Sequence, residues 1–156
     1  IYLSDILRTA DQNVMVIAEH KAEEGPDAPV RARELHLFGY NEFDSPTWHQ
    51  IIAKNQAAPI TESFTGIGYR AAPIGNDVQL VTLEKIKEKT DLQLRRINGL
   101  AGTVTEPKAL GLNVANDQQV AYVKDFTAWL NDKTMIVVTR PSKKSAALQL
   151  NKLVFK

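Results

Sequence analysis

Two prolines bracket the segment that most restricts the fold of this chain. Ala57-Ala58-Pro59-Ile60 recurs fourteen residues later as Ala71-Ala72-Pro73-Ile74. Proline disfavours helix at both ends of this segment, and Gly66-Ile67-Gly68 between them suits a reversal of the chain. About twenty residues without a helical signal are more than an ordinary connection within a compact domain contains. Residues 57–76 therefore predict an extended hairpin or a protruding arm.

The predicted arm carries side chains suited to an interface. Phe64, Ile67 and Tyr69 are costly to leave in water, and Arg70 follows them with a charge. An arm that docks on a partner explains these residues, so we predict an interface at Phe64, Ile67, Tyr69 and Arg70. The alternative is a loop folded back on the chain's own core.

Length and composition indicate one globular domain over residues 1–156. The chain is 44% hydrophobic and 24% charged, which is ordinary for a soluble protein. It has no Cys, which excludes a disulfide scaffold, a Cys-based zinc site and a Cys nucleophile. No apolar run approaches the roughly 18–20 residues of a membrane helix, so we expect no membrane partner. No secretion signal is visible, and we expect a cytoplasmic or virion location.

Several segments show strand patterns. A β-branched run predicts a strand over 13–21, and the near-alternation over 30–40 predicts a second. The two form an antiparallel hairpin, with Glu34-Leu35 as a candidate bulge. Residues 134–139 predict a third strand, whereas 145–156 fit a bulged strand about as well as a short helix.

Other segments favour helix. Ser45-Pro46 resembles a helix start, and apolar residues recur at helical spacing over 82–98 and again over 117–131. Residues 1–10 suit a short helix or an arm. The predicted fold class is therefore α+β: a small, mainly antiparallel sheet with an N-terminal β-hairpin, covered by two to three helices, plus the extended arm 57–76.

Charge is distributed unevenly along the chain. Residues 1–78 carry 6 basic and 11 acidic side chains, whereas residues 79–156 carry 13 and 7. Residues 133–156 contain six cations and no acid, and five of these cations lie in the basic C-terminal segment, 140–156. The six are Lys133, Arg140, Lys143, Lys144, Lys152 and Lys156. Such a run suits contact with a nucleic-acid backbone, and opposite charge on the two halves suits contact between copies of the chain.

Glu19-His20-Lys21 is the nearest approach to a catalytic motif. An acid-x-Lys pair on a strand is typical of metal-dependent nucleases, in which carboxylates hold Mg²⁺ and the lysine stabilises developing charge. Asp5 or Asp11 would supply the further ligand. The same pattern is common on solvated strand faces, and His20, His36 and His49 lack the spacing of a metal site. We therefore predict no metal and no cofactor.

These observations favour a non-enzymatic structural protein, a repeating subunit of a larger oligomer of the viral or phage particle, shell or tube type. Its expected partners are copies of itself or other assembly subunits. The alternative is a protein that acts on nucleic acid, either a backbone binder through the basic C-terminus or a small metal-dependent nuclease using Glu19 and Lys21. An enzymatic role is left open.

Overall fold

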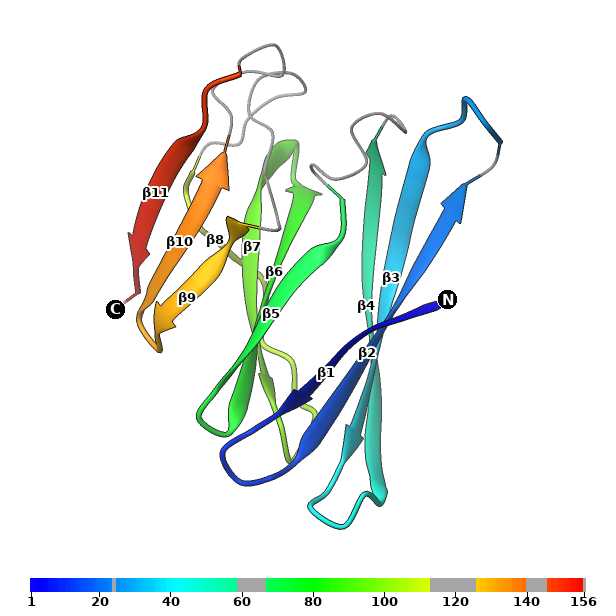
Figure 1. The fold of residues 1–156 in the computed structure, drawn as a ribbon, viewed down its shortest axis with the longest axis vertical. Helices are drawn as coiled ribbons and strands as arrows, with labels where there is room; N and C mark the ends of the chain where they lie inside the picture. Colours follow the sequence, from blue (N-terminus) through cyan, green and yellow to red (C-terminus); the bar gives the residue numbers. More distant parts are fainter. Residues whose placement is uncertain (24, 59–66, 113–125, 140–145, 156) are drawn as a thin grey trace.

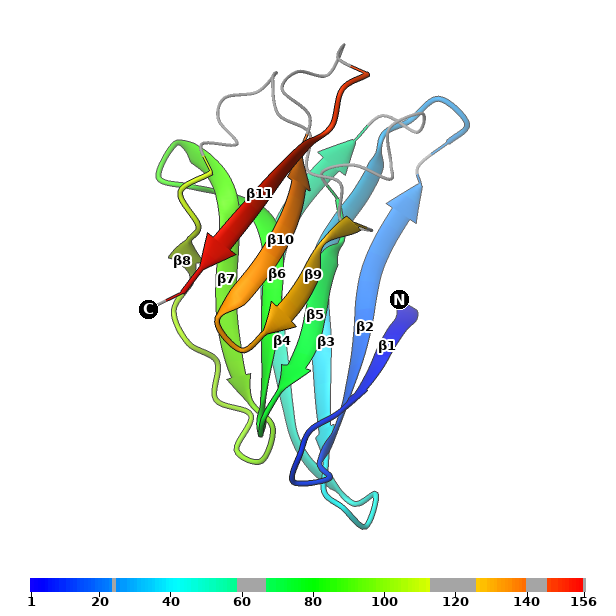
Figure 2. The same ribbon diagram turned by 60° about the vertical axis from the view of Figure 1, so that its left-hand side comes forward.

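Three antiparallel sheets form the structure, a computed structural model that describes residues 1–23, 25–58, 67–112, 126–139 and 146–155. The first sheet contains β1 (Tyr2–Arg8), β2 (Val14–Glu23), β3 (Val30–Tyr40) and β4 (Pro46–Ala58). The middle sheet contains β5 (Tyr69–Ile74), β6 (Asp77–Ile86), β7 (Lys89–Asn98) and β8 (Lys108–Ala109). The third sheet contains β9 (Ala128–Asn131), β10 (Thr134–Thr139) and β11 (Gln149–Val154). Figures 1 and 2 show the sheets as successive layers with β5–β8 between the other two.

Each sheet is a meander in which strands adjacent in the chain are adjacent in space. The β5–β6 turn is made by Gly75-Asn76, where Gly75 has a φ of 61°. The β6–β7 turn is made by Lys87-Glu88, and both residues have positive φ, 48° and 67°. Positive φ at both central residues is the geometry of a type I′ hairpin turn, which matches the twist of the flanking strands.

The space between the first and middle sheets holds the larger apolar core. Alternate residues of facing strands point into it, as expected of sheets packed face to face. Its buried residues are Met15, Ile17, Leu35, Leu37, Ile52, Tyr69, Val78, Leu80 and Ile97. A second core lies between the middle and third sheets and contains Val81, Leu92, Met135 and Val137. The middle sheet is therefore covered on both faces, and residues 78–82 of β6 are all buried, with no alternation between buried and exposed positions.

Trp48 closes one end of the first core. Its indole Nε1 donates a hydrogen bond to the Gly99 carbonyl oxygen at 3.0 Å. A Cβ at Gly39 would lie 2.1 Å from the indole, and one at Gly102 would lie 2.4 Å from it. Only glycine leaves room for the ring at these two positions.

The α+β prediction is wrong, because the described residues contain no α-helix. The expected helix at Ser45-Pro46 is strand β4, with Pro46 at its first position, where a missing N–H costs little. The expected helix over 82–98 is the β6–β7 hairpin. Of the expected helix over 117–131, residues 113–125 lie outside the described part, and β9 occupies 128–131. The segment 1–10 contains β1 rather than a helix.

The predicted strands are present. The hairpin over 13–21 and 30–40 is confirmed as β2 and β3, with a register shift between Ala32 and Glu34 beside the predicted bulge. The strand over 134–139 is confirmed as β10, and β11 occupies 149–154. The segment 57–76 joins two layers: its first two residues end β4 of the first sheet, and 69–74 form β5 of the middle sheet.

Candidate functional site

A polar cluster lies buried between the first and middle sheets. Lys54 Nζ lies 2.6 Å from Glu19 Oε1, and Lys21 Nζ lies 2.8 Å from Glu19 Oε2. Lys54 also donates to Gln56 Oε1 at 2.7 Å, and Gln56 Nε2 donates to the carbonyl oxygens of Gly68 and Leu83. These bonds tie β2, β4 and the middle sheet together.

The geometry of Glu19 bears directly on the nuclease alternative. Its side chain is 1% exposed, and each of its carboxylate oxygens pairs with the ammonium group of a lysine. Burial raises the pKa of Glu19, but Lys54 and Lys21 outweigh burial and hold the pKa below its ordinary value. Asp5 and Asp11 bond elsewhere, to the Tyr69 hydroxyl and the Thr9 hydroxyl. Across the described residues, no three His, Cys, Asp or Glu side chains form a group suited to a metal ion.

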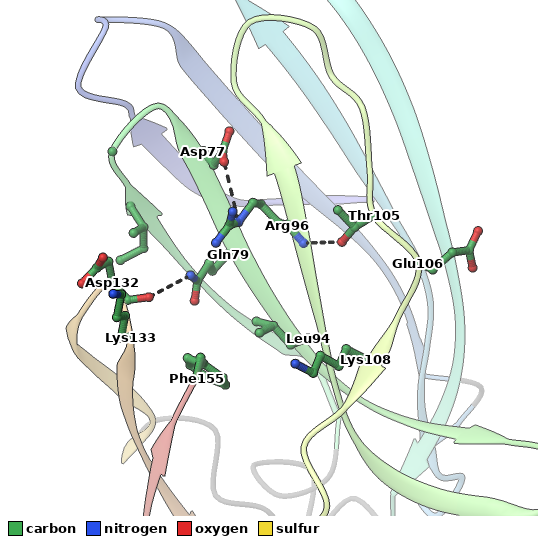
Figure 3. A pocket seen from close by; sticks show the side chains of 12 residues that line it. Asp77, Gln79, Leu94, Arg96, Thr105, Glu106, Lys108, Asp132, Lys133 and Phe155 are labelled. Atoms are coloured by element: carbon green, nitrogen blue, oxygen red, sulfur yellow. Dashed lines mark hydrogen bonds and ion pairs between the residues drawn. The ribbon is translucent and has the colours of Figure 1, made fainter.

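A pocket of about 590 Å³ lies between the middle and third sheets (Figure 3). Its polar rim contains three acids and three bases: Asp77, Glu106, Asp132, Arg96, Lys108 and Lys133. Arg96 Nε lies 3.6 Å from Asp77 Oδ2, and Gln79 donates to the Asp132 carbonyl oxygen at 3.3 Å. Because the charges balance, the pocket does not favour an anion over a cation.

Three of the four predicted interface residues, Ile67, Tyr69 and Arg70, lie at or just before the start of β5. Ile67 and Tyr69 are buried, with 3% and 6% of their surface exposed, and Tyr69 belongs to the first core. Arg70 is half-buried, and Phe64 lies outside the described residues. The chain's own sheets therefore cover Ile67 and Tyr69, as in the alternative of a segment folded back on the core.

Two of the six predicted nucleic-acid contacts are described in full. Lys133 lies in the β9–β10 turn and Lys152 lies on β11, and both are exposed. Arg140, Lys143, Lys144 and Lys156 lie outside the described residues. Lys133 lines the pocket, whereas Lys152 lies on the far side of the third sheet with Leu150 and Val154.

Edge strand β1 exposes an apolar surface. Its residues Tyr2, Leu3 and Ile6, with the preceding Ile1, are each more than 60% exposed. β1 pairs with β2 along one side only, so among the described strands its other side is a free edge. Tyr69 supports this strand from within, because its hydroxyl donates to Asp5 Oδ2 at 2.7 Å.

Edge strand β11 is a second apolar edge, in the opposite outer layer. Leu150 and Val154 are 72% and 66% exposed, and Leu148 just before the strand is 52% exposed. β11 pairs only with β10 among the described strands. A free backbone edge with exposed apolar side chains is a template for the addition of a further strand.

Sequence reasoning missed both edges. The sequence predicts a short helix or an arm over 1–10, and over 145–156 it fits a bulged strand about as well as a short helix. The signal in the sequence is the row of consecutive apolar residues at 1–3. Tyr2 and Leu3 point to opposite faces of a strand, so such a strand carries apolar side chains on both faces. Whether such a strand lies at an edge depends on the sheet order, which residue spacing alone does not encode.

Comparison of the chain with protein-family models, curated proteins and solved structures gives no match. Among the described residues, none forms a helix long and apolar enough to span a membrane. The functional interpretation therefore depends on the geometry of this chain.

Proposed function

We propose that this chain is a non-enzymatic assembly subunit that joins copies of itself head to tail, with β1 of one copy added to β11 of the next. The observation that carries the proposal is the pair of exposed apolar edge strands in opposite outer layers. Burying large apolar side chains from both edges favours association, at about 25 cal/mol per Å² of apolar surface. The free N–H and C=O groups of the edges would pair at the same time.

Charge supports a second copy as the partner. Residues 1–58, which contain the first sheet, carry 5 basic and 9 acidic side chains. Residues 126–156, which contain the third sheet, carry 6 basic side chains and 1 acidic one. The two outer layers therefore attract each other between copies.

Head-to-tail contact of this kind is heterologous, since two different surfaces meet. Such contacts build rings where the rotation closes and filaments where it does not. A copy that joins through its β11 keeps its own β1 free for a further copy, so growth continues until a ring closes. This property suits a repeating subunit of a shell or tube.

The test is light scattering coupled to size exclusion, with the unchanged chain and with Ile6→Lys, Leu150→Lys and Phe43→Lys. Ile6 and Leu150 represent the two edges, and Phe43 is a control, because it is 78% exposed but lies in the 41–45 turn. We expect oligomers for the unchanged chain and Phe43→Lys, and monomers for each edge variant. An equimolar mixture of the two edge variants keeps one intact interface and should form dimers only.

Each other outcome contradicts the proposal in a distinct way. A monomeric unchanged chain at every salt and protein concentration overturns self-assembly. Loss of assembly in Ile6→Lys but not in Leu150→Lys indicates an isologous β1–β1 contact instead. Circular dichroism of each variant shows whether lost assembly reflects lost folding.

A further inference from the structure

His36 and His49 come together on the outer face of the first sheet, the face turned away from the middle sheet. On β3, Leu35 and Leu37 point into the first core, so His36 between them points outward. On β4, Ile52 points into the core. His49 lies an odd number of residues away from Ile52, so its side chain points to the opposite, exposed face. The register pairs His49 with Phe38 and His36 with Ile51, so the two histidines are diagonal neighbours across adjacent strands.

The two imidazoles face each other through their nitrogens. His36 Nδ1 lies 3.4 Å from His49 Nε2, and the ring planes differ by 12°. The Phe38 ring stacks on His49 with centroids 4.5 Å apart, which restrains the orientation of His49. His49 is exposed and His36 is half-buried, so solvent and dissolved ions reach the pair.

The distance between the nitrogens matches the bite of a tetrahedral metal ion. Zn²⁺ binds imidazole nitrogen at about 2.0–2.1 Å, so two ligands at a tetrahedral angle lie about 3.3–3.4 Å apart. A square-planar ion with similar bond lengths needs two neighbouring nitrogens only about 2.8–3.0 Å apart. The observed 3.4 Å therefore favours a tetrahedral ion.

We propose that His36 and His49 form a two-imidazole site for a divalent transition-metal ion of tetrahedral preference, with Zn²⁺ as the representative. In the metal-free pair, one ring donates a hydrogen bond to the other. Metal binding requires that ring to carry its proton on its other nitrogen, so that both facing nitrogens present lone pairs. Water fills the remaining two positions, as in sites that keep open coordination positions.

A neighbouring carboxylate makes the site more favourable for a cation. Glu34, two residues before His36 on β3, accepts a hydrogen bond from His20 Nδ1 at 2.7 Å. Glu34 and His36 are alternate residues of β3, so the carboxylate lies on the same face of the sheet as the histidine pair.

The test is titration of the full chain with ZnCl₂ at pH 7.5, followed by calorimetry and by NMR of the histidine ring nitrogens. We expect one Zn²⁺ per chain and shifts of His36 Nδ1 and His49 Nε2. His36→Ala and His49→Ala should each weaken binding at least about tenfold, because the second imidazole acts at high effective concentration. His20→Ala is the matched control, since His20 is half-buried and engaged by Glu34, and it should leave Zn²⁺ affinity within about twofold.

Three results would overturn the site: no Zn²⁺ binding, binding that survives both His36→Ala and His49→Ala, or ring shifts confined to His20. MgCl₂ should cause no ring shifts, because Mg²⁺ prefers oxygen ligands. Shifts with MgCl₂ equal to those with ZnCl₂ would indicate a general salt effect and contradict the proposal. Thermal unfolding of each variant separates loss of the ligands from loss of the fold.

Discussion

Lys54 donates to Glu19 across 2.6 Å, and both side chains are at most 1% exposed between the first and middle sheets. Removing Lys54 leaves the buried Glu19 carboxylate with one of its two ammonium partners, the partly exposed Lys21. We expect Lys54→Met to lower the free energy of unfolding by about 3–5 kcal/mol, measured by chemical denaturation. The double variant Glu19→Leu/Lys54→Met should recover much of that loss, because it removes both buried charges.

The matched control is an exposed pair in the same molecule. Lys85 Nζ lies 2.8 Å from Glu88 Oε2, with both side chains largely exposed to solvent. Exposed pairs contribute little, so Lys85→Met should leave unfolding nearly unchanged. If Lys54→Met and Lys85→Met have equal effects, burial does not determine the strength of the Glu19 pair.

The same ion pair predicts a pH dependence. Burial raises the pKa of Glu19. The charges and hydrogen bonds of Lys54 and Lys21 lower it by more than burial raises it, so the folded-state pKa lies below the ordinary value of 4.5. The stabilisation is therefore complete above about pH 4.5 and is lost as pH falls through the folded-state pKa. Denaturation midpoints from pH 7 to pH 3 should fall less steeply for Glu19→Gln than for the unchanged chain. Parallel curves for the two proteins would show that Glu19 is not linked to folding.

The sequence permits prediction of the hairpin of β2 and β3, because one face of that hairpin is buried and the apolar residues alternate. The middle sheet is different. Its strands are buried on both faces, so β6 and β7 lose the alternation that identifies strands, and their apolar residues also fit helical spacing. The buried Glu19 pair and the His36–His49 pair were not predictable, since each joins residues from different strands through the sheet register.

Tyr69 connects the middle sheet to edge strand β1. Burial first, and the Asp5 carboxylate second, raise the pKa of the Tyr69 hydroxyl, so it stays protonated and donates at neutral pH. Tyr69→Phe removes the bond to Asp5 and should cost about 1 kcal/mol. Amide exchange should accelerate in Tyr2–Arg8 more than in β3. Tyr2→Phe is the control on the same strand, because Tyr2 is 62% exposed, and equal acceleration in both variants would exclude a specific role for Tyr69.

Trp48 gives a test of the close packing at the end of the first core. A Cβ at Gly39 would lie 2.1 Å from the indole, so Gly39→Ala must displace the ring. We expect a loss of about 1–3 kcal/mol and a red shift of tryptophan fluorescence as the ring becomes more exposed. Gly25→Ala is the matched control, because nothing lies within 4 Å of a Cβ at that position. Unchanged stability in Gly39→Ala would mean that the indole has another site of equal energy.

The β6–β7 turn predicts a stabilising change. Lys87 and Glu88 both have positive φ, a conformation that side chains with a Cβ rarely adopt. Asn-Gly is the preferred pair in such a turn, so Lys87→Asn/Glu88→Gly should raise Tm by about 2–4 °C in thermal unfolding. The reciprocal change is Gly75→Lys in the β5–β6 turn, where φ is 61° and a Cβ meets nothing within 4 Å. That variant should lower Tm by a similar amount through the backbone alone. A lower Tm for the Asn-Gly variant would show that side-chain contacts of these residues, such as the Lys85–Glu88 ion pair, outweigh the strain of their backbone.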